Sequence, residues 1–544
     1  MMGISETTHN VREEEDLKKP SAQNIQDALD LADMGHAPAL ERKFNMWSMF
    51  ALAFSVLGTW STFAMDLDSG LSNGGSIAIL WGLCLVAFCN ICVCLSLGEL
   101  CSSMPTALGQ AYWVHRIYPT QVGRFISYLC AWTNTFGWWT LTASQNAFMA
   151  NFLLEMKVIF KPDWAGATTG WIEFLLYVGV TLTFTLVNIV ACKGDKVLPW
   201  LNNVVGIQFG TLMVVFMLAL LISVGINDNL SFQSGKFVFG NWINLTDWPD
   251  GVVWFTGLLQ AAYGLTAFDS VIHMVEEIPA PRKNVPRVLY LAVIFGATSG
   301  GLFMVICLFC IQDIDSLLDS VTGLPFVQLV TSTVGKGGGA ALISLFIVNG
   351  LGQGISIMTS SSRLTWGFAR DGGLPWSNYF AHIDGFWHAP VRALWGQGVI
   401  IGLVGVLYLF AETVLQAILS VSTIALTISY GLPIMALLIR GRDKIPPPTF
   451  SLGRYGPFIN TVSVIYCSVT TVFFFFPESQ KPTPSDMNYA IAVFGVMLVI
   501  SLAFWFIKGS KTYLQTNEAQ IEMLRARELE HAEMNETYNA KEAA

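Results

Sequence analysis

The sequence predicts an all-α polytopic membrane protein with twelve transmembrane helices, and three observations indicate this fold class. First, 53% of the 544 residues are hydrophobic and only 12% are charged, a balance far from that of soluble domains. Second, apolar runs of about 20 residues recur along the chain, the length that spans a bilayer core. Third, lysine and arginine are unequally distributed between the segments that join these runs. Lipid is therefore the expected solvent for most of the chain.

Twelve apolar runs have the length of a spanning helix. An even number of spans places both termini on the same side of the membrane. All but five of the 29 Lys and Arg residues then fall on the side of the termini, so the positive-inside rule predicts that both termini are cytoplasmic. The runs are centred near residues 58, 86, 138, 181, 212, 264, 298, 350, 400, 426, 467 and 498, and the five basic residues on the opposite side are Lys157, Lys161, Lys236, Lys336 and Lys481.

The apolar runs divide the chain into three parts. Residues 1–46 are predicted to form a cytoplasmic N-terminal tail, residues 47–510 the transmembrane domain, and residues 511–544 a cytoplasmic C-terminal tail. The first part lacks an apolar core followed by a small-residue cleavage site, so no signal peptide is expected. The formal net charge of −9 and the lack of a basic stripe exclude nucleic acid as an expected partner.

Small and hydroxyl-bearing residues interrupt the first and the sixth apolar run, at residues 57–62 and 262–269. Backbone at membrane depth can unwind only where it is buried in protein or lines a cavity. The two segments lie five helices apart, which is typical of transporters built from two inverted five-helix halves with a solute site near the middle of the membrane. Either segment alone also fits close helix packing, but their matched positions favour interrupted helices.

Polar residues recur at helical spacing inside the spans near residues 138, 350 and 426. Such stripes normally face the bundle or a wet cavity, and hydrogen bonding between helices is the alternative interpretation. The stripe near residue 426 comprises Ser420, Thr423, Thr427 and Tyr430. Together with the interrupted segments, the other two stripes supply the candidate substrate-binding residues Gly58, Thr59, Trp60, Ser61, Asn134, Trp138, Tyr263, Gly264, Phe268, Asn349 and Gln353.

Three motifs lie in segments on the side of the termini: Gly98-Glu99-Leu100 with residues 105–112, residues 276–286, and Ser362-Arg363 with residues 368–375. In this order, they make residues 40–510 resemble the amino acid-polyamine-organocation superfamily, in particular its fungal amino acid/choline transporter branch, which includes GABA permeases. The resemblance implies a LeuT-like core of five plus five inverted helices with two peripheral helices, alternating access, and proton-driven uptake at the plasma membrane. One departure is Gln110, which stands where the wider superfamily usually has the second residue of a Gly-Gly pair.

Charged residues of these motifs are candidates for a gate near the membrane face. Opposite charges there could form ion pairs that close the exit in one state and separate in the other, with Arg370 and Glu277 as one candidate pair. The alternative is ordinary positive charge in cytoplasmic loops. Buried carboxyls can also alternate between protonated and ionised forms, which makes Asp269 and Glu99 candidates for ion coupling. The gate candidates are Glu276, Glu277, Arg282, Lys283, Arg363, Arg370 and Asp371.

Two substrate classes remain open, because both occur in the resembling branch. An amino acid or GABA would place its carboxylate on main-chain amides around Gly58, Thr59 and Trp60, at the start of a half-helix. The quaternary ammonium of choline would instead prefer aromatic faces, with Asp269 as counter-charge. The interrupted first helix slightly favours the amino acid or GABA. The aromatic candidates are Trp60, Trp138, Tyr263 and Phe268.

Two further function classes are an enzyme and a nutrient sensor. An enzyme needs a convergent catalytic set, but His273 is the single histidine inside an expected span, and no nucleophile–base or metal-ligand spacing occurs. The sequence therefore predicts a non-enzyme without cofactor or metal, whose partners are a small solute, protons and the lipid bilayer. A nutrient sensor could keep the same pocket, but the short tails favour transport.

Overall fold

The computed structural model describes residues 22–530, except 165, 167–168, 195, 319, 321–323, 410–413, 478, 484–486 and 516–518. Residues 1–21 of the expected N-terminal tail and residues 531–544 of the expected C-terminal tail lie outside the described residues. Within the described part the fold is all-helical, and its β-structure is limited to two isolated bridges, Asn73–Asn244 and Asp384–Ala389.

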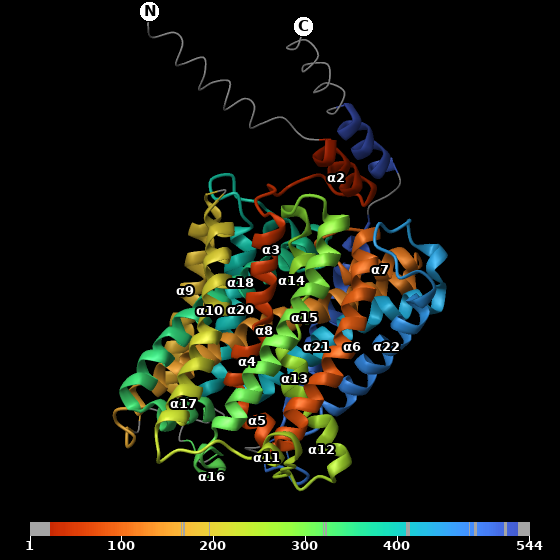
Figure 1. The fold of residues 1–544 in the computed structure, drawn as a ribbon. Helices are drawn as coiled ribbons and strands as arrows, with labels where there is room; N and C mark the ends of the chain where they lie inside the picture. The colour runs from red at the N-terminus through yellow and green to blue at the C-terminus, as the bar shows by residue number, and fades with distance from the viewer. Residues whose placement is uncertain are drawn as a thin grey trace, which may run out of the picture.

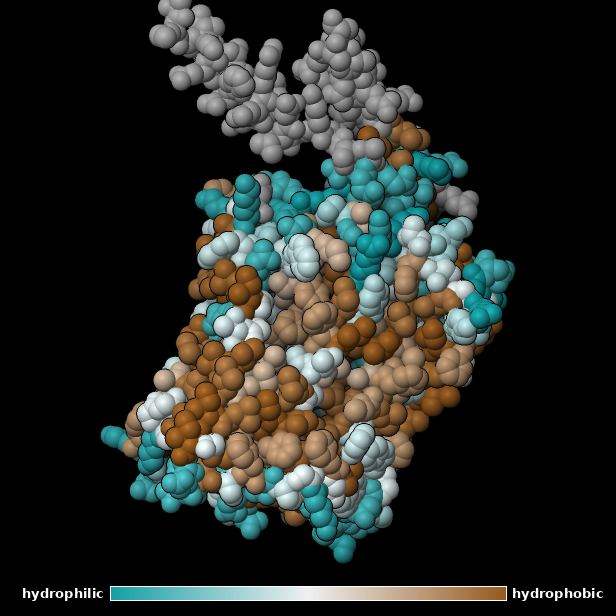
Figure 2. Space-filling view, in the orientation of Figure 1, coloured by the Kyte–Doolittle hydropathy of each residue, from teal (hydrophilic) through white to brown (hydrophobic). Residues whose placement is uncertain are grey.

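Long helices pack side by side and run in roughly the same direction through the molecule (Figure 1). The surface carries a hydrophobic band between two hydrophilic ends (Figure 2), because apolar side chains of the outer helices point away from the bundle. Exposed Leu, Ile, Val and Phe side chains in such number are stable only against lipid. The expectation of a polytopic helical membrane protein is therefore confirmed.

Nine helices of the described residues are long and apolar enough to cross a membrane. Each contains the centre of one of the expected spans. The first consists of two helical pieces in succession, and the other eight each contain one long α-helix. They contain α3 (Met46–Leu57) with α4 (Thr59–Met65), α6 (Gly75–Ser103), α9 (Gly170–Cys192), α10 (Val197–Ile226), α15 (Pro281–Cys310), α18 (Lys336–Arg370), α21 (Val414–Arg440), α22 (Gly456–Phe473) and α23 (Ala490–Phe504).

The three remaining expected centres lie in helices of a different character. Residue 138 lies in α8 (Gln121–Val158), a 38-residue helix rich in Thr, Ser, Asn and Gln. Residue 264 ends α13 (Leu258–Gly264), which follows α12 (Asp250–Thr256), and residue 400 lies in the 14-residue helix α20 (Val391–Val404). The shorter elements include α2 (Ala22–Asp33), α5 (Leu67–Ser72), α7 (Gln110–Ile117), α11 (Gly235–Gly240), α14 (Ser270–His273), η2 (Val275–Glu277), α16 (Ile314–Leu318), α17 (Pro325–Val334) and α19 (Ser377–Phe380).

Both sequence segments singled out as interruptions break a helix. Gly58 separates α3 from α4 and has a left-handed backbone with φ 55°, a conformation that glycine adopts without steric cost. After α13, Ala267 also has a positive φ, of 64°, before α14 begins. A non-glycine residue in this region is strained, and such strain tends to persist at functional sites.

The two interruptions lie close together because α13 packs directly on α4. Gln260 Nε2 donates to the carbonyl oxygens of Phe63 and Asp66, at 3.2 and 2.9 Å. A Cβ on Gly264 would lie 2.5 Å from the Phe63 ring, so only glycine permits this approach. Carbonyls of α4, the helix after the first interruption, thus receive a side-chain donor from α13, the helix before the second interruption.

The ends of the described chain meet on one face. Helix α2 and the helix of residues 519–530 lie at the same end of the bundle (Figure 1), and Arg525 approaches Asp33 at 3.6 Å. Helix α2 is further held by ion pairs of Asp27 with Arg42, at 3.0 Å, and of Asp30 with Arg282, at 2.8 Å. We call this end, marked by residues 22–33 and 519–530, the tail face.

Close packing of α15 against the first interruption generates a stability prediction. A Cβ on Gly300 would lie 2.6 Å from Cγ2 of Thr59, so Gly300→Val is expected to destabilise the fold by about 1–3 kcal/mol through overpacking. Gly210→Val in α10 is the matched control, since nothing lies within 4 Å of its Cβ position. Thermal unfolding in detergent, followed by fluorescence-detected size exclusion, compares the two midpoints. Equal midpoints would show that α15 does not depend on this contact.

Candidate functional site

A buried carboxylate, Asp269, accepts hydrogen bonds from several helices. Its Oδ1 accepts from the Tyr430 hydroxyl at 2.7 Å. Its Oδ2 accepts from Gln110 Nε2 at 2.8 Å and from Trp138 Nε1 at 3.3 Å, and lies 3.0 Å from His273 Nε2. All five side chains are buried. The site therefore joins α7, α8, α14 and α21 to the end of the second interruption.

His273 contacts Asp269 through one ring nitrogen and a main-chain carbonyl through the other. The ring Nδ1 of His273 lies 2.9 Å from the carbonyl oxygen of Ala107, and a carbonyl only accepts, so this nitrogen carries a hydrogen. The 3.0 Å contact between Nε2 and Oδ2 is then a hydrogen bond only if one further proton lies on the imidazole or on the carboxyl. The pair is consequently net neutral with that proton and carries one negative charge without it.

Further contacts hold this cluster in place. Asn134 Nδ2 donates to Gln110 Oε1 at 3.1 Å, which orients the amide that faces Asp269. The amide of Ala267 donates to the Tyr430 hydroxyl at 3.2 Å. The Phe268 ring packs on Tyr430 with centroids 4.9 Å apart. The strained turn at Ala267 is thus fixed by the same tyrosine that donates to Asp269.

The first interruption forms a second polar cluster with α18. The hydroxyl of Ser61 lies within hydrogen-bond distance of the Gly58 carbonyl, at 2.9 Å, and of Gln353 Oε1, at 3.1 Å. The Gln353 amide lies directly against the Gly58 Cα, so any Cβ at that position would collide with it. No side chain caps α4, and the first amides of a helix have no acceptor within it.

Several buried polar atoms near this interruption have no hydrogen-bond partner. They are Thr59 Oγ1, Trp60 Nε1, and both Oδ1 and Nδ2 of Asn349. Leaving a buried polar atom unpaired costs about 1–3 kcal/mol, and such atoms are suited to a polar ligand. Asn349 lies on α18 four residues before Gln353, on the same helical side.

The aromatic candidates do not form one cage in this conformation. Trp60 packs into the apolar scaffold with Phe209 and Phe303, both at centroid distances of 5.1 Å. Trp138 contacts the His273 ring, and the Tyr263 hydroxyl lies 2.8 Å from Ser144 Oγ. Among the described residues, no ring contact joins any two of Trp60, Trp138, Tyr263 and Phe268.

Two buried ion pairs connect η2 with α18 near the tail face. Arg363 Nε donates to Glu277 Oε1 at 2.7 Å, with both side chains almost fully enclosed. Arg370 Nη1 donates to Glu276 Oε1 at 2.8 Å and to Oε2 at 3.0 Å. The partner of Arg370 is therefore Glu276, and the candidate pairing of Arg370 with Glu277 is wrong. Glu276 and Glu277 are adjacent in η2, but their arginine partners lie two helical turns apart on α18. Sequence spacing alone does not show which glutamate pairs with which arginine.

Asp371 and His36 form a further contact beside these pairs, at 3.5 Å. Burial raises the pKa of Asp371 to about 7, although Arg370 lowers it. Burial, aided by the positive charge of Arg370, holds the pKa of His36 well below its ordinary value. Near pH 7, His36 is accordingly neutral and Asp371 is only partly ionised.

The other charged candidates lie apart from these pairs. Glu99 binds Arg442 and accepts from the Leu452 amide at 2.9 Å, which joins α6 to the segment after α21. Arg282 pairs with Asp30 of α2, and Lys283 is exposed at the start of α15. Glu99 thus anchors a peripheral segment and does not contact Asp269.

Sequence reasoning did not assign the partners of Asp269. His273 follows Asp269 by four residues, the spacing that brings two side chains onto one helical side, so this pair was detectable. Gln110 was noted as a departure from a motif and Tyr430 as part of a polar stripe, but nothing in the sequence joins them to Asp269. The ion pairs of Asp27 and Asp30 in α2 were likewise not predicted, because a hydrophilic tail does not indicate which residues it contacts.

Comparison with known proteins identifies the family. Residues 44–498 match the family model described as amino acid permease. A choline transporter of Saccharomyces cerevisiae is 29% identical over 89% of this chain and 84% of its own length. A GABA-specific permease of the same yeast is 28% identical over 90% and 84%, and amino-acid permease 2 of Neurospora crassa is 26% identical over 89% and 88%. Because the family model covers most of the chain, and the helices confirm a multi-pass membrane protein, this chain belongs to the amino acid permease family of transporters.

Proposed function

We propose that this chain is a proton-coupled permease that takes up an amino acid or GABA across the plasma membrane by alternating access. Membership of a permease family supports transport as opposed to enzymatic activity. The observation that carries the proposal is the buried Asp269–His273 pair, located where the second interrupted helix meets the bundle. A proton carrier needs such a group, whose charge changes by one within a low-dielectric site.

The proposed architecture has twelve spans. It adds α8, the α12–α13 segment and α20 to the nine long apolar helices. Interruptions in the first and sixth spans support two inverted five-helix halves with two peripheral helices. Residues 47–510 would form the transmembrane domain, with cytoplasmic tails at 1–46 and 511–544. The meeting of α2 and residues 519–530 on one face supports a common side for both termini.

The proposed substrate site lies at the first interruption. Uncapped amides at the start of α4 can receive a carboxylate, and the positive end of the helix dipole favours it. Ser61, Gln353 and Asn349 would complete the polar contacts, since both side-chain heteroatoms of Asn349 lack a partner. Gly58 is required there, because a side chain would displace Gln353. This arrangement favours solutes that bear a carboxylate.

Choline is the second candidate substrate, favoured by similarity to a relative named as a choline transporter. The site geometry favours it less. Asp269, the expected counter-charge, already accepts from Tyr430, Gln110 and Trp138 and contacts His273. A quaternary ammonium would therefore have to compete with three donors and with His273 for this carboxylate.

The proposed gate consists of the Arg363–Glu277 and Arg370–Glu276 pairs. These pairs would close the path toward the tail face in this conformation and separate when the site opens to that side. Because α14 and η2 follow each other directly, protonation at Asp269 and His273 would act on the same short segment that carries Glu276 and Glu277.

Uptake in cells that lack their own carriers tests the function. Labelled GABA, neutral amino acids and choline are compared, each with and without a protonophore. Protonophore-sensitive uptake of GABA or an amino acid is expected, whereas selective choline uptake would assign the alternative substrate. No uptake of any of the three, from protein shown to be at the cell surface, would favour a nutrient sensor that binds without transport.

Replacement of the proton-binding pair tests coupling. Asp269→Asn and His273→Gln are each expected to reduce protonophore-sensitive accumulation at least about tenfold and to flatten the pH profile, because the pair can no longer change its charge. Asp228→Asn changes an exposed carboxyl after α10 and serves as the control. Normal accumulation with an unchanged pH profile in Asp269→Asn would exclude Asp269 as an essential proton carrier.

Charge exchange tests the gate. Glu276→Arg or Arg370→Glu alone leaves a buried charge unpaired, which costs about 3–5 kcal/mol, so both single variants are expected to lose most uptake. The double variant Glu276→Arg/Arg370→Glu restores the pairing and is expected to recover part of the uptake rate per molecule at the surface. The mismatched double variant Glu277→Arg/Arg370→Glu is the control. Equal recovery in both double variants would contradict the specific pairing.

A further inference from the structure

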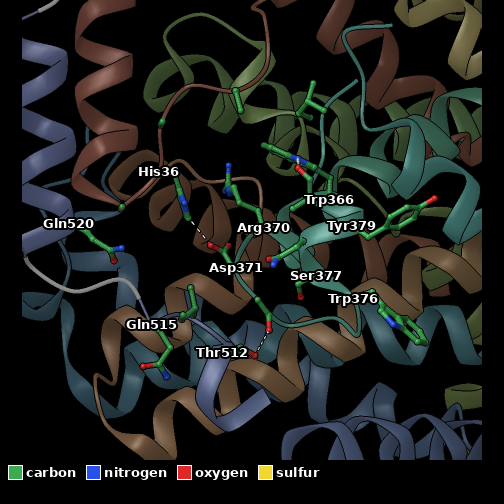
Figure 3. Close-up of a pocket in the computed structure, with 18 of the residues that line it drawn as sticks. His36, Trp366, Arg370, Asp371, Trp376, Ser377, Tyr379, Thr512, Gln515 and Gln520 are labelled. Atoms are coloured by element: carbon green, nitrogen blue, oxygen red, sulfur yellow. Dashed lines mark hydrogen bonds and ion pairs between the residues drawn. The ribbon is translucent and has the colours of Figure 1, made fainter. Parts of the chain in front are cut away.

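A polar pocket on the tail face adjoins an apolar groove in the side of the bundle. The pocket has a volume of about 1040 Å³ and lies between the end of α18 and the residues that follow α23 (Figure 3). The groove has a volume of about 650 Å³ and runs between α8, α20 and α23. Trp376 and Tyr379 line both cavities, so the two adjoin at these side chains. Neither cavity includes the Asp269 cluster.

The polar pocket has an excess of positive charge. Arg370, Lys508 and Lys511 line it, and both lysines are exposed and form no ion pair with the described residues. Arg370 uses Nη1 for Glu276, but its Nε and Nη2 are buried without a hydrogen-bond partner. Asp371 is the single acid of the lining. Burial raises its pKa to about 7, so near pH 7 it is only partly ionised and repels a bound anion less than a full negative charge would.

A π-helical turn, η6 (Trp505–Gly509), contributes to this arrangement. It follows α23 directly and contains Lys508, and Lys511 comes two residues after its end. Single π-helical turns inside helices occur frequently at functional sites. The turn places the basic residues at the end of an apolar spanning helix, the level at which lipid headgroups lie.

The groove has the opposite character, because aromatic and aliphatic side chains form nearly all of its surface. Trp395 and Val496 are 41% and 61% exposed, toward the lipid. At its junction with the pocket, the Arg392 guanidinium lies 4.7 Å from the centre of the Tyr379 ring. A ligand that fits both cavities must be anionic at one end and long and apolar at the other.

We propose that an anionic glycerophospholipid binds here, with its phosphate at Arg370, Lys508 and Lys511 and an acyl chain in the groove lined by Trp395 and Val496. Basic pockets between spanning helices at the headgroup level are suited to such lipids. The bilayer supplies the ligand at high local concentration, whereas a soluble anion would leave the groove empty. Because Arg370 also pairs with Glu276, bound lipid would contact the ion pair proposed as the gate.

Lipid binding to the purified full-length chain tests the charge at the headgroup end. Native mass spectrometry is used with phosphatidylserine, phosphatidylcholine and the acyl-free headgroup glycerophosphoserine. Phosphatidylserine is expected to bind at least about tenfold more tightly than either of the others. The double variant Lys508→Gln/Lys511→Gln is expected to lower the affinity for phosphatidylserine about tenfold. Lys193→Gln/Lys196→Gln, the same charge change in the segment between α9 and α10, is expected to have little effect.

Filling the groove tests the acyl chain separately. Val496→Trp occupies the groove and is expected to weaken phosphatidylserine binding about tenfold, whereas Val499→Trp on the same helix lies outside the groove lining and is expected to leave it unchanged. Both variants replace an exposed valine on the same helix, and size exclusion checks that both are folded. The proposal would be overturned if phosphatidylcholine or glycerophosphoserine bound as tightly as phosphatidylserine. It would also be overturned if either variant had the same effect as its control.

Discussion

The constraint on which the structure depends is that a bilayer offers no water to polar groups, so the protein must satisfy them itself. Asp269 shows the consequence most clearly. Its carboxylate is removed from both solvent and lipid, and Tyr430, Gln110, Trp138 and His273 from separate helices converge on it. Tyr430, Gln110 and Trp138 lie on three other helices, so the hydrogen bonds that satisfy Asp269 also hold these helices together.

The same constraint explains how a chain with interrupted helices remains stable. Main-chain carbonyls of α4 would be costly in lipid, but Gln260 of α13 donates to those of Phe63 and Asp66, and Gln353 of α18 lies against Gly58. Thr59 Oγ1 at the start of α4, which no side chain caps, and both side-chain heteroatoms of Asn349 on α18 remain unpaired. A polar solute bound at this interruption would relieve the unpaired atoms there.

Near the tail face, buried carboxylates pair with arginines. Arg363 and Arg370 pair with η2, and Arg282, which follows η2, pairs with Asp30 of α2. Ion pairs of this kind contribute little net stability but fix which surfaces meet. Since η2 follows α14 without an intervening loop, the segment that holds His273 also holds Glu276 and Glu277, and a displacement of either end moves the other.

The sequence by itself determined the membrane class, the position of both interruptions and the identity of most polar candidates, because apolar run length, glycine and helical spacing are local properties. The His273–Asp269 pair was also within its reach, since four residues separate them. Only the tertiary structure decided that Gln110 and Tyr430 converge on Asp269, that Arg370 pairs with Glu276 and not Glu277, and that Trp60 packs into the scaffold away from the other aromatic candidates. Tyr430 and Asp269, for example, lie 161 positions apart. Which of these residues meet depends on how helices rotate and pack about one another, which no local pattern in the chain specifies.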